Sequence, residues 1–243
     1  MLADRAAHPM EEEALPLTIS PLAEPQAVAA PLPPPVAAGP SSRALADTCT
    51  TISELEEAVR GFDGCSLKRF ATRTVFADGI ATADLMVIGE APGAQEDQEG
   101  IPFCGPSGKL LDKMLRAIGR SREGGYYITN MVFWRPPGNR TPNPQEIALC
   151  LPFVEKHIAL VKPKALLLAG ATPTKALLAT ETSVSRLRGK KFEYRNVYLE
   201  GNLPCFVTYH PSYLLRQPSQ KRQSWIDMLT VQAFLRNTDR NPA

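Results

Sequence analysis

The chain has 243 residues, of which 44% are hydrophobic, so it can bury the core of one α/β domain and still carry a tail. Lys and Arg total 27 against 25 acidic residues, so bulk charge neither requires nor excludes a nucleic-acid partner, and a polyanion must be bound by a local basic patch. No apolar run approaches the roughly 20 residues of a membrane span, and five cysteines without a secretory leader indicate a reducing compartment. We therefore expect a cytoplasmic, monomeric protein without membrane contact.

Residues 1–45 are rich in Ala, Pro and Leu and show no sustained helical or strand periodicity. A proline cluster at residues 31–35 removes backbone donors and favours an extended polyproline II conformation. We expect a disordered tail over residues 1–45 and a folded domain over residues 46–240. We interpret the tail as a dispensable leader, with docking of a partner as the alternative.

The first helical pattern covers residues 52–62, where Thr51 or Ser53 can serve as the N-cap and apolar residues share one face. After it, short aliphatic runs alternate with helix-length segments, as in parallel strands of βαβ units. The expected strands cover residues 85–89, 126–129, 165–169 and 205–209, with weaker β segments around 192–199. The expected later helices cover residues 107–118, 145–160, 173–178 and 224–235.

Each expected strand is followed at its carboxyl end by a residue suited to line a pocket. These residues are Glu90, Asn130, Gly170 and His210. In an open parallel sheet, ligands bind at the carboxyl ends of the strands. A carboxylate, an amide, a glycine and an imidazole at one edge therefore indicate an active site.

The loop after the first strand carries three carboxylates over residues 89–97, and Gly89 and Gly93 permit close approach of its backbone to a ligand. A solvated βα turn explains those acids equally well. Phe103, further along, is either a core residue or a stacking platform for a planar base. Neither feature assigns a function by itself.

His210 is followed by proline, which restricts its orientation, and it can donate a hydrogen bond to charge that develops on a leaving group. Leu214 and Leu215 beside Arg216 suit an apolar wedge and a phosphate anchor on duplex DNA. Leucines packed inward at a helix N-terminus are the equal alternative.

Three longer segments occur in a fixed order: GEAPGAQEDQEGIPFCGPSGKLLDKML, YYITNMVFWRPPGNRTPNPQEI and YHPSYLLR. In order and spacing they resemble family 4 of the uracil-DNA glycosylase superfamily. The resemblance covers roughly the whole chain after the Pro-rich tail and implies a three-layer α/β/α sandwich around a four-stranded parallel sheet. It also implies a monofunctional enzyme that flips uracil out of DNA and hydrolyses its N-glycosidic bond, leaving an abasic site.

The resemblance further implies roles for individual residues. Glu90 would belong to the catalytic, water-positioning motif, and His210 would stabilise the departing uracil O2. Asn130 would read the O4 and N3–H edge with one donor and one acceptor, and the base would stack on Phe103. The remaining residues implied at the substrate are Ala91, Gly93 and Glu96, the last crowding the uracil C5 edge.

Ala91 stands where the best known glycosylase branch has a water-orienting aspartate, so Glu90, Asp97 or the backbone would have to hold the water. DNA contacts are expected from the intercalating loop and from local basic residues. They are Arg140, Arg188, Ser212, Leu214, Leu215 and Arg216.

Family 4 enzymes typically hold a [4Fe–4S] cluster with four cysteines, and the matching positions here are Phe62, Cys65, Trp134 and Cys150. Because such a cluster takes four thiolates, the resemblance predicts a variant with no cluster, no metal and no other cofactor. Phe62 and Trp134 would fill the vacated space, and Cys65 and Cys150 would remain as buried thiols.

Two other functions stay open. The first is excision of other deaminated bases, such as hypoxanthine or xanthine, although Asn130 favours uracil. The second is a uracil-DNA binder without turnover. That branch is expected to carry a basic, His-containing insertion after the second strand, where residues 135–144 of this chain contain no histidine.

Overall fold

The computed structural model describes residues 40–240, so most of the expected tail lies outside the described residues. Helix α1 (Ser42–Thr48) spans the expected boundary between tail and domain at residues 45 and 46. Helix α2 (Ile52–Gly61) follows, and of its two candidate N-caps Thr51 is the one used. The Thr51 side chain accepts from the Glu54 backbone N–H, and Glu54 returns a bond to the Thr51 backbone, forming a capping box.

Within the described residues the sheet has six strands in the order β1-β3-β2-β4-β6-β5. The four inner strands are parallel, and both edge strands run antiparallel to their neighbours. The expected four-stranded parallel sheet is thus the centre of a larger mixed sheet. The strands are β1 (Ala77–Gly79), β2 (Leu85–Gly89), β3 (Tyr127–Asn130), β4 (Ala165–Ala169), β5 (Lys191–Tyr194) and β6 (Leu203–Thr208).

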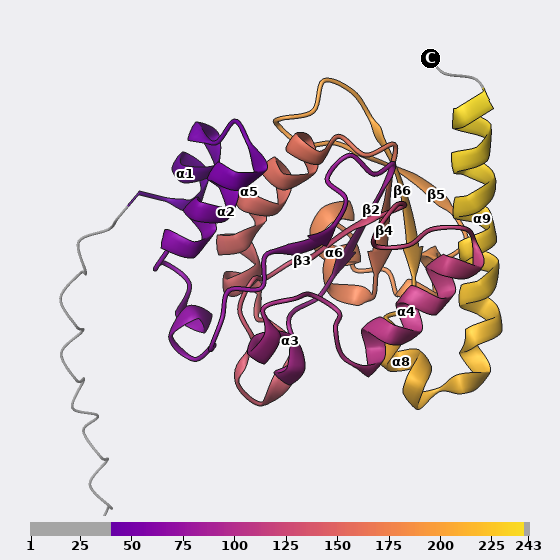
Figure 1. Cartoon of the computed structure of the whole chain (residues 1–243), viewed down its shortest axis with the longest axis horizontal. Coiled ribbons are helices and arrows are strands. Elements are labelled where there is room, and N and C mark those ends of the chain that lie inside the picture. The colour runs from indigo at the N-terminus through magenta and orange to yellow at the C-terminus, as the bar shows by residue number, and fades with distance from the viewer. Residues whose placement is uncertain (1–39, 241–243) are drawn as a thin grey trace, which may run out of the picture. The chain divides into compact units, whose positions relative to one another are not determined.

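Helices cover both faces of the sheet, which confirms the α/β/α sandwich (Figure 1). Alternate residues of a strand face opposite sides of the sheet. Met86 and Ile88 therefore pack beneath α1, α2 and α5 (Pro144–Val161), whereas Leu85 and Val87 pack beneath α4 (Pro106–Ala117) and α9 (Lys221–Arg240). The remaining helical segments are η1 (Ser66–Arg69), α3 (Ala94–Glu99), η2 (Pro137–Asn139), α6 (Ala171–Leu178), α7 (Val184–Leu187), α8 (Pro211–Arg216) and η3 (Pro218–Gln220).

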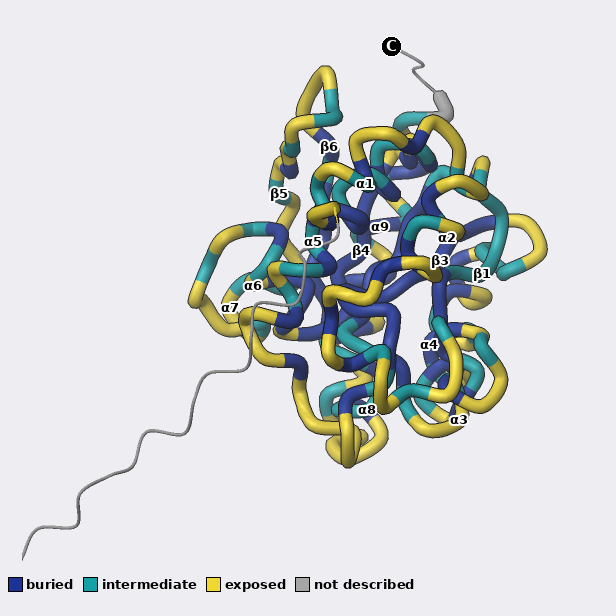
Figure 2. Tube along the Cα trace, turned by 90° about the vertical axis from the view of Figure 1, so that its left-hand side faces the viewer, coloured by how far each residue is buried: buried dark blue, intermediate teal, exposed yellow. Residues whose placement is uncertain are grey.

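The inner strands end in register. Gly89 of β2 lies opposite Asn130 of β3, and Ala169 of β4 lies opposite Thr208 of β6. The inner strands are buried, while α3 and α8 lie at the same end of the described domain in both views (Figures 1 and 2). No helix among the described residues is long and apolar enough to cross a membrane.

Candidate active site

A cavity of about 350 Å³ opens at the edge where the four inner strands end. Its wall comes from the loop after β2, the turn before α4, the loop around η2 and the start of α8. The lining residues are Glu90, Ala91, Pro92, Gly93, Glu96, Phe103, Ser107, Pro136, Asn139, Arg140, His210, Ser212 and Arg216. Among the expected site residues, Asn130, Arg188, Leu214 and Leu215 are not part of this wall.

His210 occupies the N-cap of α8, with its ring held from one side. Its Nδ1 accepts the Ser212 backbone N–H at 3.2 Å and lies 2.7 Å from the Ser212 hydroxyl oxygen. Burial, with a smaller contribution from the nearby Arg216 charge, lowers the pKa of His210 to about 4. With Nδ1 as acceptor, the neutral ring carries its proton on Nε2 and can donate it to a ligand.

Gly170 allows the turn after β4 to approach this histidine. Its φ is +102°, and a Cβ at this position would lie 2.9 Å from the Cβ of His210. Both the conformation and the contact favour glycine. Gly170, after β4, therefore leaves the space that His210, after β6, occupies.

Asn130 ends β3 opposite Gly89 and is 1% exposed. Neither its amide oxygen nor its amide nitrogen has a hydrogen-bond partner among the described residues. A buried amide without partners costs about 1–3 kcal/mol, so its retention indicates a ligand that satisfies it. Gly89 leaves the space that this requires, since a Cβ there would lie 2.5 Å from the Asn130 amide oxygen and 2.3 Å from the Phe103 ring.

Phe103 is 5% exposed and lines the cavity, with its ring centroid 5.7 Å from that of His210. Its φ of 55° is unfavourable for a residue with a large side chain. Arg122 holds this turn, because its guanidinium donates to the carbonyl oxygens of Pro102 and Phe103 at 2.8 and 2.6 Å. Gly108 is also required, since a Cβ there would clash with the Phe103 carbonyl oxygen at 1.6 Å.

Arg122 was missed in the sequence, where it is an isolated basic residue without a motif. Two carboxylates on other elements orient it: Asp78 of β1, at 2.6 Å, and Asp112 of α4, at 3.1 Å. Only the folded chain brings these groups together.

The carboxylates after β2 separate into different roles. Glu90 lines the cavity, and its Oε2 accepts a hydrogen bond from the Thr172 hydroxyl at the start of α6. The Glu96 oxygens accept from the backbone N–H groups of Gly93 and Gly105 at 3.1 and 2.9 Å, so this side chain joins the two loops that form one wall. Thr172 was not expected at the site.

Asp97 was one candidate for holding the attacking water. Its carboxylate is 4% exposed and does not line the cavity. Instead, Oδ1 accepts from the backbone N–H groups of Thr72 and Arg73 at 2.8 and 3.1 Å, fixing the loop before β1 against α3. Of the two carboxylates expected to hold the water, only Glu90 lines the cavity, and the backbone stays as the other expected alternative.

Two basic residues expected at DNA have protein partners. Arg188 binds both carboxylate oxygens of Asp227, and its side chain is only 12% exposed, so its guanidinium is held by α9. Arg140 forms a bidentate pair with Glu146 at 2.6 and 2.9 Å, but it lines the cavity and its side chain is 46% exposed. The Arg140 guanidinium therefore remains accessible to a DNA phosphate, whereas that of Arg188 does not.

The two leucines of α8 face in opposite directions. Leu214 is fully buried, which contradicts its expected contact with DNA, and Leu215 is 43% exposed. Arg216, one position further, is exposed and lines the cavity. Of the two leucines, Leu215 is therefore the candidate wedge, and it lies beside an arginine without a side-chain partner among the described residues.

The residues at the expected cluster positions do not fit a [4Fe–4S] group. The buried Phe62 ring packs edge-on against Phe153 with centroids 5.3 Å apart, and Trp134 donates from Nε1 to the Thr74 hydroxyl at 3.0 Å. The remaining thiols, Cys65 and Cys150, contact each other, and this contact together with burial raises the pKa of Cys150. Among the described residues no group of three or more Cys, His, Asp or Glu side chains could hold a metal ion.

Comparison with known proteins identifies one family. The model of the uracil DNA glycosylase superfamily matches residues 76–230. The type-4 uracil-DNA glycosylase of Sulfurisphaera tokodaii is 35% identical over 176 residues, covering 71% of this chain and 79% of that protein. The type-4 enzyme of Pyrobaculum aerophilum is 35% identical over 181 residues, covering 73% and 91%. That of Thermotoga maritima is 35% identical over 168 residues, covering 69% and 84%.

Proposed function

Because this chain belongs to the uracil-DNA glycosylase superfamily, we propose that the cavity at the strand ends is the site where uracil is cut from DNA. The protein is a DNA repair hydrolase that acts on the N-glycosidic bond of uracil. The observation that carries the assignment of the site is the buried Asn130 amide without a partner.

We propose that Asn130 selects uracil by complementarity. Uracil presents an acceptor at O4 and a donor at N3–H, and one amide offers the matching donor and acceptor. Phe103 stacks on the base plane, and Glu96 closes the wall next to the loops that it joins. A base with another edge pattern would leave the buried amide unsatisfied, which disfavours it strongly.

Bond cleavage puts negative charge on the departing base and positive charge on the sugar. His210 acts as a neutral donor from Nε2, held in place before the reaction because Ser212 occupies Nδ1. Glu90, oriented by Thr172, positions the water and stabilises the sugar cation. No lysine is among the described residues that line the cavity, which favours hydrolysis without a covalent lyase step.

We infer that Leu215 and Arg216 contact the DNA around the extruded nucleotide, with Ser212 and Arg140 at the cavity mouth. The apolar packing of Phe62 and Trp134 supports a protein without an iron–sulfur cluster. Five free cysteines support a reducing, cytoplasmic compartment. We also propose that the protein acts as a monomer.

The test is single-turnover cleavage of a uracil-containing oligonucleotide by wild type, Asn130→Ala and His210→Ala, together with iron analysis and absorbance near 400 nm. We expect uracil release by colourless wild-type protein, and a loss of about 10²-fold or more in each variant. Retained activity in both variants would refute the assigned roles. Stoichiometric iron would refute the cluster-free proposal, and release of hypoxanthine or xanthine but not uracil would change the assigned substrate.

A further inference from the structure

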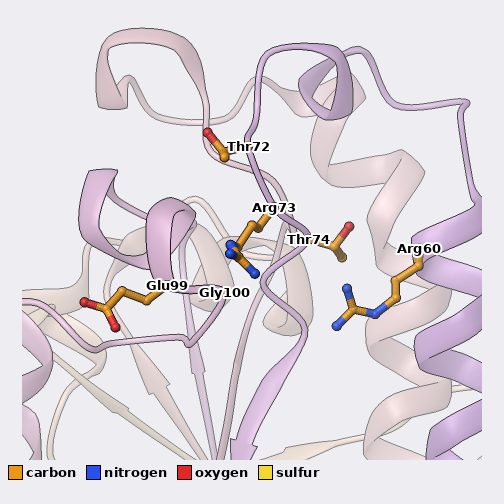
Figure 3. A pocket seen from close by; sticks show the side chains of 6 residues that line it. All are labelled: Arg60, Thr72, Arg73, Thr74, Glu99 and Gly100. Carbon is orange, nitrogen blue, oxygen red and sulfur yellow. The ribbon is translucent and has the colours of Figure 1, made fainter.

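A second cavity, of about 430 Å³, lies on the other side of α3 from the candidate active site. Figure 3 shows its lining, which comes from the end of α2, the loop before β1 and the end of α3. The lining residues are Arg60, Thr72, Arg73, Thr74, Glu99 and Gly100. This set, called the arginine groove below, contains neither an aliphatic nor an aromatic side chain, so it suits a charged, hydrated ligand and not a base or a lipid chain.

Arg73 is held by its backbone while its guanidinium stays available. The Asp97 carboxylate binds the backbone N–H groups of Thr72 and Arg73, and Gly100, with φ +78°, lets the Arg73 side chain pass close to α3. The Arg73 guanidinium forms no hydrogen bond or ion pair with the described residues, and the residue is exposed. A fixed backbone and a free cation are the elements of an anion site.

Arg60 approaches the groove from α2. Its Nε and Nη2 bind Glu56 Oε1 at 3.0 and 2.5 Å, and the Arg60 side chain is 54% exposed. Such an exposed pair within one helix is weak, so a phosphate can compete for this guanidinium. Glu99 is the one acidic residue of the lining, and Figure 3 shows its carboxylate pointing away from both arginines.

The chemistry therefore favours a phosphate, because guanidinium groups bind phosphate oxygens bidentately and threonine hydroxyls can add hydrogen bonds. Helix α3 separates this groove from the active site: Gly93 and Glu96, at its start, line the first cavity, and Glu99 and Gly100, at its end, line the second. Six helical residues span about 9 Å, close to the axial rise of three nucleotides.

We propose that the arginine groove binds a backbone phosphate of the uracil-containing strand about two or three nucleotides from the extruded base. The inference rests on the proposed function, since it takes DNA as the ligand. Arg60 and Arg73 lie before residues 76–230, the segment matched by the family model, so the groove is assigned from this structure alone.

The test combines an altered protein with an altered DNA. The KM for uracil release is measured for wild type and for the double variant Arg60→Ala, Arg73→Ala on single-stranded substrates, each with one neutral methylphosphonate at successive positions around uracil. For wild type, one position two or three nucleotides from uracil is expected to raise KM about tenfold. The double variant is expected to have a raised KM on unmodified DNA. A methylphosphonate at that position should not raise its KM further.

Arg69→Ala is the matched control, because Arg69 is an exposed arginine of η1 that does not line the groove. It should keep the wild-type response to the methylphosphonate. The slope of log KM against log salt should fall by about 0.7 for each groove arginine removed. If the methylphosphonate raised KM equally in wild type and double variant, the proposed phosphate site in the arginine groove would be wrong. Absence of uracil release by wild type on any substrate would instead overturn the proposed function.

Discussion

At the scale of single residues, the candidate site contains a buried amide and a half-buried imidazole that the fold leaves incompletely satisfied. Asn130 has no partner for either amide atom, and the Nε2 of His210 is free to donate into the cavity. Such groups cost stability when no ligand is bound. They are therefore the positions at which activity and stability should respond in opposite directions.

The first prediction concerns Asn130→Leu, which keeps a branched shape and removes the unsatisfied amide. We expect the free energy of unfolding to stay the same or to rise by about 1 kcal/mol, because the desolvated amide is gone. Uracil release should fall by about 10³-fold or more, because the base edge loses its partners. Urea unfolding and single-turnover assays check this, and a loss of stability of several kcal/mol would mean that the amide has a structural role.

The second prediction concerns the protonation state of His210. Because its pKa is lowered to about 4, the ring is neutral at physiological pH. We expect the ratio of wild-type to His210→Ala rates to be about 10²–10³ and to stay constant as pH passes through 6.5, the ordinary pKa of histidine. The ratio should change only towards pH 4, where protonation of Nδ1 removes the acceptor used by Ser212. A change in the ratio centred near pH 6.5 would refute the neutral donor.

At the scale of elements, the short helix α8 (Pro211–Arg216) carries residues proposed for catalysis and residues proposed for DNA contact. Its N-cap is His210, its buried face carries Leu214 and its exposed face carries Leu215. The contrast between the buried Leu214 and the exposed Leu215 is set by the helical turn, since consecutive residues point about 100° apart. From the sequence the two leucines were equivalent, and only the packing of α8 distinguishes them.

The third prediction compares these two leucines. Leu215→Ala should weaken uracil release from duplex DNA more than from single-stranded DNA, because an apolar wedge is needed to unstack a duplex. Its stability should stay close to that of wild type, since Leu215 is 43% exposed. Leu214→Ala should instead cost about 2–4 kcal/mol of stability through a core cavity. Equal effects of both substitutions on stability would contradict the assignment.

At the scale of the whole molecule, a second histidine, buried in the core, makes the stability of the fold depend on pH. His157 of α5 is fully buried, stacks on Phe76 with ring centroids 4.5 Å apart, and lies with Nε2 2.9 Å from the Tyr127 hydroxyl. Burial lowers the pKa of His157 to about 3. The folded domain thus keeps both His157 and His210 neutral at pH values where the unfolded chain protonates them.

The fourth prediction follows from that difference. Below pH 6.5 the unfolded chain binds more protons than the folded one, so the stability present above this pH is lost as pH falls towards 3 to 4. Each histidine should contribute up to about 1.4 kcal/mol per pH unit over this range. Urea unfolding of wild type and His157→Gln, from neutral pH to about pH 5, should give a shallower dependence for the variant. Identical dependences would refute the assignment.

The fold followed from the sequence to the extent that local patterns control it. Runs such as Leu85–Gly89 and Ala165–Ala169 are buried on both faces, so their periodicity and length were sufficient to place them. The edge strands were harder to place, because β1 has only three residues and β5 is largely exposed. Their positions depend on pairing with the adjacent strands β3 and β6.

The sequence by itself determined the parallel sheet and the residues at the strand ends, because burial periodicity and chain direction are local properties that bring those ends to one edge. Only the tertiary structure decided which charged groups are available. In the sequence, Arg188 and Asp97 could not be distinguished from exposed charged residues of the site. In the structure, Arg188 binds Asp227, and Asp97 binds the backbone of the loop before β1. Partners distant in sequence make that choice, since a buried charge is stable only where the fold supplies its counterpart.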